Sequence, residues 1–105
     1  DTLFGGADGD MLFGDEGMDT LDGGDGDDTL DGGLDNDQLA GGAGNDYLDG
    51  GDGDNVIDAG EGNDTAYGGT GIDRIAGRAG DDYLNGGDGN DELQGEDGND
   101  IVEGD

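Results

Sequence analysis

Carboxylates are almost the only side chains in this chain that could carry chemistry. The 105 residues include 31 Asp and Glu against 2 Lys and Arg, and His and Cys are absent. Ser and Lys are also absent, so the usual nucleophiles and the neutral-pH general base are missing. Neighbouring carboxylates such as Asp27 and Asp28 could act as an acid–base pair. Such neighbours recur so regularly along the chain, however, that we expect no enzymatic activity.

The net charge of −29 limits the partners that the chain can have. Phosphate backbones and anionic lipid surfaces repel such a chain, so we expect no binding to nucleic acid. No apolar run approaches the roughly 20 residues of a membrane span, so we expect no direct membrane insertion by this segment. Without Cys there is neither a disulfide framework nor a thiolate metal site. Cations remain as the expected partners.

The carboxylates belong to a repeat of nine residues. Eleven consecutive units follow one another from Gly5 over residues 5–103, without insertion or deletion. The fifth unit, residues 41–49, shows the pattern G-G-x-G-x-D-x-U-x, in which U is a large aliphatic residue. The sixth position is Asp in ten units and Asn55 in the other, and the eighth is aliphatic in ten units and Ala66 in the other. A hydrophobic content of 28% would permit disorder, but a disordered linker would not keep these positions in phase.

Each unit predicts a Gly-rich turn of six residues and a three-residue strand. Gly allows a positive φ and close backbone approach, and stacked strands can bury an aliphatic side chain that one unit alone cannot. Two units per coil predict 18-residue coils, with two parallel sheets and a thin core between them. The predicted fold class is all-β: a right-handed parallel β-roll (a β-helix or solenoid), with a single domain over residues 1–105. Odd units supply Leu12, Leu30, Leu48, Ala66, Leu84 and Val102 to one sheet. Even units supply Leu21, Leu39, Ile57, Ile75 and Leu93 to the other, with Leu3 at its start.

The units resemble the RTX, or haemolysin-type calcium-binding, nonapeptide repeat, and complete units cover 99 of 105 residues. The resemblance implies calcium ions in the turns of a β-roll. It also implies a module of a bacterial protein exported by type I secretion, such as a toxin, protease, lipase, epimerase or adhesin. We therefore expect a secreted or cell-surface location. The chain starts at a sixth position and ends at a second, so we expect a fragment of a larger protein whose other domains are partners.

Calcium is the cofactor that the resemblance implies, and it prefers six to eight oxygen ligands. A Gly-rich turn leaves several carbonyls unpaired, and the sixth position brings a carboxylate to the same point. By the resemblance, each ion is shared by two turns 18 residues apart. One turn gives its second and fourth carbonyls and its Asp, and the next gives its first and third carbonyls and its Asp. The example site combines Gly24, Gly26 and Asp28 with Gly41, Ala43 and Asp46. The predicted side-chain ligands are Asp10, Asp19, Asp28, Asp37, Asp46, Asn55, Asp64, Asp73, Asp82, Asp91 and Asp100.

These side chains give up to about nine shared calcium sites, counted between successive odd and successive even turns. Asn55 adjoins two of these sites. It is neutral and keeps one amide oxygen, so we expect the weakest calcium binding at both of its sites. Arg78, at a second position, places a cation near another site and should weaken it.

An alternative function is docking of a protein or carbohydrate partner on an outer sheet face. Positions seven and nine flank the buried aliphatic residue and point outward. All three Tyr fall on odd units, as does Phe13. Exposed apolar area often marks interaction sites, and Tyr is enriched in them. The possible docking face therefore contains Phe13, Tyr47, Tyr67 and Tyr83. The competing interpretation is that these bulky residues only cover the strand ladder.

Overall fold

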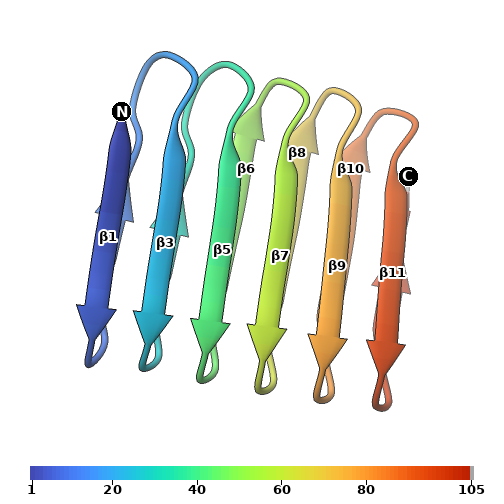
Figure 1. Ribbon diagram of the computed structural model, residues 1–105. Helices are drawn as coiled ribbons and strands as arrows, with labels where there is room; N and C mark the ends of the chain where they lie inside the picture. The colour runs from blue at the N-terminus through green and yellow to red at the C-terminus, as the bar shows by residue number, and fades with distance from the viewer. Residues whose placement is uncertain (105) are drawn as a thin grey trace.

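A computed structural model describes residues 1–104 and contains two parallel sheets of six strands each (Figure 1). We name each sheet after the repeat units that supply its eighth-position residues, and not after its strand numbers. In order, the even sheet contains β1 (Thr2–Ala7), β3 (Thr20–Asp25), β5 (Gln38–Ala43), β7 (Val56–Glu61), β9 (Arg74–Ala79) and β11 (Glu92–Asp97). The odd sheet contains β2 (Met11–Phe13), β4 (Thr29–Asp31), β6 (Tyr47–Asp52), β8 (Thr65–Thr70), β10 (Tyr83–Asp88) and β12 (Ile101–Glu103). Consecutive strands alternate between the sheets, and Leu21 pairs with Leu39 at a spacing of 18 residues. The predicted all-β parallel solenoid is confirmed.

The molecule is a thin slab with extents of 33 × 33 × 12 Å. Strands of the even sheet run in one direction at the front of Figure 1, and strands of the odd sheet run in the opposite direction behind them. Turns close the coil at both edges of the slab. Within residues 1–104 we find no helix with the length and apolar character that a membrane span requires.

The core consists of the eighth-position side chains, which the two sheets point toward each other. Leu21, Leu30 and Leu48 are completely buried, and Ala66 fills the same place in β8. The first-position residues also face inward, since Ala59 is completely buried. The predicted assignment of eighth positions to the two sheets is confirmed by the strand pairing. Burial fades at the C-terminal coil, where Val102 is 46% exposed.

The strands are longer than the predicted three residues. Only β2, β4 and β12 have three residues, and the other nine strands have six. The first three positions of the following unit continue the ladder, as the pairing of Gly24 with Gly42 shows. A Cβ on Gly24 would collide with the carbonyl of Gly6 in the preceding coil, so Gly lets the coils approach closely here. The turn that remains on the odd side contains only the fourth to sixth positions.

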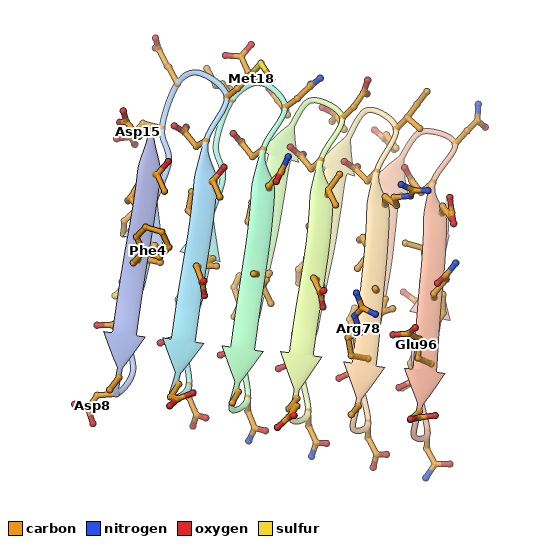
Figure 2. The ribbon with its side chains drawn as sticks, in the orientation of Figure 1. Phe4, Asp8, Asp15, Met18, Arg78 and Glu96 are labelled. Atoms are coloured by element: carbon orange, nitrogen blue, oxygen red, sulfur yellow. The ribbon has the colours of Figure 1, made fainter. Side chains whose placement is uncertain are left out.

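The second and fourth positions adopt positive φ angles even where they are not Gly. The non-Gly residues with positive φ are Asp8, Asp15, Asp35, Arg78 and Glu96, at 70–81°. All five replace Gly at a second or fourth position, so the coil imposes this backbone conformation on any residue there. Figure 2 shows Asp8 in a lower turn and Arg78 beside Glu96 on neighbouring strands. Arg78 forms ion pairs with Asp58 at 2.8 Å and with Glu96 at 3.6 Å.

Candidate metal centre in the turns

The sixth-position side chains form two rows, one along each turn edge of the slab. The odd turns lie at the lower edge in Figure 1 and the even turns at the upper edge. In the middle coils these polar side chains point into the interior, and Asp28, Asp37 and Asp46 are at most 3% exposed. A row of buried carboxylates is costly unless each one is paired. The hydrogen-bond partners of the two oxygens of each carboxylate therefore show whether an oxygen remains free to bind a cation.

One oxygen of each buried side chain accepts a hydrogen bond from the preceding coil. The backbone N–H of Asp28 donates to Oδ1 of Asp46 at 2.8 Å, and that of Asp46 donates to Oδ1 of Asp64 at 2.7 Å. The same bond joins Asp19 to Asp37 on the even edge, at 2.8 Å. These bonds form a ladder along each edge, and they fix the rotation of the side chain. The Oδ2 atom consequently faces the next coil.

The Oδ2 atoms are buried and have no hydrogen-bond partner. Among residues 1–104 this holds for Asp10, Asp19, Asp28, Asp37, Asp46, Asp64, Asp73, Asp82 and Asp91. A native interior contains few unsatisfied polar atoms, and each of them calls for a physical explanation. Nine equivalent carboxylate oxygens without a donor form an acceptor-only environment that a cation can satisfy.

Backbone carbonyls converge on the same places. A Cβ built on Gly32 would lie 2.6 Å from Oδ2 of Asp37 and 2.7 Å from the carbonyl oxygen of Gly50 in the next coil. Both oxygens thus point at one small space beside a first-position glycine. Such hard oxygen donors, a carboxylate from one turn and a carbonyl from the next, match the ligand preference of calcium.

The residues of the example site lie in the stacked units 3 and 5, and their assignment as calcium ligands stays a prediction. The carbonyls of Gly24 and Gly26 point to the next coil, where they would meet a Cβ on Gly42 or Gly44. The carbonyl of Gly41 points back toward Gly23, at 2.7 Å from a Cβ built there. The carbonyl of Ala43 already accepts a bond of 2.8 Å from the N–H of Gly26, which leaves it one lone pair.

Burial raises the pKa of five carboxyls that belong to the two rows, namely Asp37, Asp46, Asp64, Asp73 and Asp82. The pKa of Asp64 rises to about 6, chiefly through burial, with a further contribution from the neighbouring carboxylates Asp46 and Asp82. Burial likewise raises the pKa of Asp73 to about 6. Hydrogen bonds from the backbone act in the opposite direction, but they do not compensate for burial. The charged rows therefore favour a nearby cation.

No group of three or more Asp or Glu side chains gathers as a metal cluster within residues 1–104. Intervals between two Asp turns instead have one sixth-position carboxylate on each coil, and the two intervals beside Asn55 have a carboxylate on one coil and an amide on the other. The shared sites therefore stay a prediction.

The fifth position contributes a second ladder that the sequence analysis did not predict. The N–H of Asn63 donates to Oδ1 of Asn45 at 2.9 Å, and the N–H of Asp81 donates to Oδ1 of Asn63 at 2.9 Å. These bonds run opposite to those of the sixth position, because here the later residue donates. The preference for Asp or Asn at the fifth position was the available signal. Met18 and Ile72 interrupt this row on the even edge, and both are exposed.

The possible docking residues are only partly brought together. The rings of Tyr47 and Tyr67 have centroids 5.7 Å apart, and those of Tyr67 and Tyr83 are 5.9 Å apart. Phe13 lies on β2, and β4 separates it from Tyr47 on β6. The three tyrosines therefore form a continuous row across β6, β8 and β10, and Phe13 stands apart.

A comparison with protein-family models identifies the class of protein. The model described as the RTX calcium-binding nonapeptide repeat (4 copies) matches residues 4–39, 31–66 and 67–102. The chain therefore belongs to the RTX calcium-binding repeat family, whose repeats bind calcium and are typical of type I-secreted bacterial proteins. Neither a curated protein nor a solved structure gives a significant match.

Proposed function

We propose that the chain is a calcium-triggered folding module in which calcium bridges successive turns. The observation that carries this proposal is the set of nine buried Oδ2 atoms without a hydrogen-bond partner. The side-chain ligands are the sixth-position Asp residues, and the remaining ligands are carbonyls equivalent to those of Gly24, Gly26, Gly41 and Ala43. Ions in these intervals convert repulsion between stacked carboxylates into attraction.

The charge of the chain explains why folding depends on the ion. A net charge of −29 opposes compaction, and the core contains little beyond two rows of single aliphatic side chains. Metal sites that exist only in the folded chain couple binding to folding. Without calcium we expect disorder, because the buried carboxylates then have neither a cation nor a donor.

The coupling suits a protein that crosses membranes before it folds. Low cytosolic calcium keeps the module extended, and higher calcium outside the cell folds it. We infer on this basis that the chain is part of a bacterial protein secreted by a type I system. Its parent is a toxin, protease, lipase, epimerase or adhesin, and the module itself performs no chemistry.

A calcium titration followed by far-ultraviolet circular dichroism tests the proposal. The spectrum should be that of a disordered chain in excess chelator and should change cooperatively to a β spectrum as calcium is added. Magnesium at the same concentration is the control, since it demands a stricter geometry and dehydrates reluctantly. A cooperative β signal in excess chelator at pH 7.5 would contradict the proposal.

A second candidate function is docking of another domain of the parent protein on the outer face of the odd sheet. The contiguous row of Tyr47, Tyr67 and Tyr83 favours it, since these rings gather on one face of an otherwise strongly acidic molecule. Tyr47 remains 44% exposed within this row. Covering of the strand ladder by these rings is the competing role, and replacement of the rings separates the two.

A further inference from the structure

Asn55 is the one sixth-position residue whose side chain carries a hydrogen-bond donor. Its Oδ1 accepts a bond of 2.9 Å from the backbone N–H of Asp37, as the Oδ1 atoms of the Asp residues do in the same ladder. Only the amide oxygen can accept this bond. The ladder therefore fixes the orientation of the amide and points Nδ2 toward the next coil.

Nδ2 of Asn55 stands where Oδ2 stands in the other units. A Cβ built on Gly50 would lie 2.7 Å from this nitrogen and 2.6 Å from the carbonyl oxygen of Gly68. The equivalent distances at Gly32 are 2.6 Å to Oδ2 of Asp37 and 2.7 Å to the carbonyl oxygen of Gly50. The backbone of this turn thus resembles that of the turn of Asp37. The difference is that a nitrogen stands in place of a carboxylate oxygen.

The nitrogen donates to two carbonyls of the interval that it faces. One bond of 3.3 Å goes to the carbonyl of Gly53 in its own turn, and one of 3.4 Å goes to that of Gly68 in the next coil. These carbonyls occupy a fourth and a first position, which belong to the ligand set expected for calcium. The amide hydrogens therefore satisfy oxygens that an ion would otherwise bind, and they present partial positive charge to any cation.

We propose that the interval between the turns of Asn55 and Asp73 is closed by hydrogen bonds and binds no calcium. The interval between Asp37 and Asn55 remains a calcium site, because Oδ2 of Asp37 is unpartnered there and the amide contributes its oxygen side. Of the two intervals that flank Asn55, one therefore binds calcium and the other does not. This inference rests on the proposed function, and it lowers the ceiling from about nine ions to about eight.

Within the folded chain, the closed interval is paired without an ion. It lacks the buried, unpartnered carboxylate oxygen that nine Asp residues contribute elsewhere in the rows. The amide of Asn55 consequently joins its turn to that of Asp73 without an ion, near the middle of the chain. The remaining intervals of both edges depend on calcium for the same connection.

Native mass spectrometry of the calcium-saturated chain tests this by counting ions. Asn55→Asp should bind one ion more than the wild type, because it restores an oxygen to the closed interval. Asp73→Asn is the matched control on the same edge and should bind one ion fewer, since its nitrogen would close the interval toward Asp91. Equal, non-zero counts for wild type and Asn55→Asp overturn this inference and leave the proposed function standing. No bound calcium in either protein overturns both.

Wild-type crystals grown with terbium in place of calcium give a test that does not depend on the folding of a variant. Anomalous scattering should show an ion between the turns of Asp37 and Asn55 and none between those of Asn55 and Asp73. An anomalous peak in the second interval overturns the inference.

Discussion

The backbone N–H of Asp28 donates a hydrogen bond of 2.8 Å to Oδ1 of Asp46, the equivalent residue one coil further along. This bond holds two successive coils of the odd edge in register and leaves the second oxygen of Asp46 buried without a partner. One carboxylate thus has two separable roles, since Oδ1 belongs to the ladder and Oδ2 to the candidate metal centre.

Replacing Asp46 in two ways should separate these roles. Asp46→Asn keeps an oxygen for the N–H of Asp28 but points a nitrogen at the next coil, so it should remove one calcium ion and raise the calcium midpoint of folding. Asp46→Ala should do the same and also leave a buried N–H unpaired, which costs about 1–3 kcal/mol more. Urea unfolding at saturating calcium measures this difference. Equal stabilities of the two variants would contradict the role of Oδ1.

Acidic pH should stabilise the calcium-free fold and weaken calcium binding. The pKa of Asp64 and Asp73 is about 6 in the folded chain, against an ordinary value of 3.8. Between these values the folded chain binds more protons than the unfolded chain, so stability without calcium falls as pH rises from about 4 to 6. In calcium-free buffer we expect more β structure at pH 4.5 than at pH 7.5.

With calcium present, protons and calcium compete for the same carboxylates, so acid lowers the calcium affinity of the folded chain. The same protons stabilise the calcium-free fold, however, whereas carboxyls with ordinary pKa values in the unfolded chain are mostly ionised at pH 5. The calcium midpoint of folding should therefore be no higher at pH 5 than at pH 7.5. Asp64→Asn combined with Asp73→Asn removes the two groups and should make the midpoint less dependent on pH. A midpoint that rises with acidification would contradict the raised pKa of these carboxyls.

The eighth-position residues and the sixth-position Asp residues were sufficient to predict most of the fold. Leu21 and Leu30 lie in different sheets because nine residues make half a coil, and that follows from the period alone. The length of the strands did not follow, since Gly24 is a poor strand former and only the close stacking of coils places it in a ladder. Low intrinsic propensity was overridden by contacts between coils.

The candidate site could be predicted as a set of residue types but not as a set of atoms. The row of Asp residues indicated a cation, yet the sequence does not say which oxygen faces the backbone and which faces the interval. That division decides the chemistry of Asn55, whose oxygen accepts the bond of the ladder and whose nitrogen faces the next interval. The backbone N–H of Asp37 determines the orientation of the Asn55 amide, because it donates to Oδ1 of Asn55. This N–H points at Asn55 only in the folded coil.

First-position side chains should control calcium binding through their volume. A methyl group on Gly32 would lie 2.6 Å from Oδ2 of Asp37, which is too close for an undisturbed carboxylate. Gly32→Ala should therefore raise the calcium midpoint of folding. Ala59 already carries such a methyl beside the turn of Asp64, so Ala59→Gly should lower the midpoint. The two variants control for each other, because site volume predicts opposite shifts of their calcium midpoints. Shifts in the same direction would contradict an effect of site volume.

The tyrosine row should contribute modestly to stability and strongly to docking. Changing Tyr47, Tyr67 and Tyr83 to Thr removes two ring contacts, each worth about 0.5–1.5 kcal/mol, and keeps residues suited to strands. We therefore expect the variant to fold with calcium at a nearly unchanged midpoint and to unfold at a somewhat lower urea concentration.

If the row is a docking face, the variant should lose affinity for the other domains of the parent by tenfold or more, as measured by calorimetry. Phe13→Thr is the matched control, since Phe13 lies on the same sheet outside the row, and it should leave that affinity unchanged. Unchanged affinity of the triple variant would assign the tyrosines to covering the ladder alone.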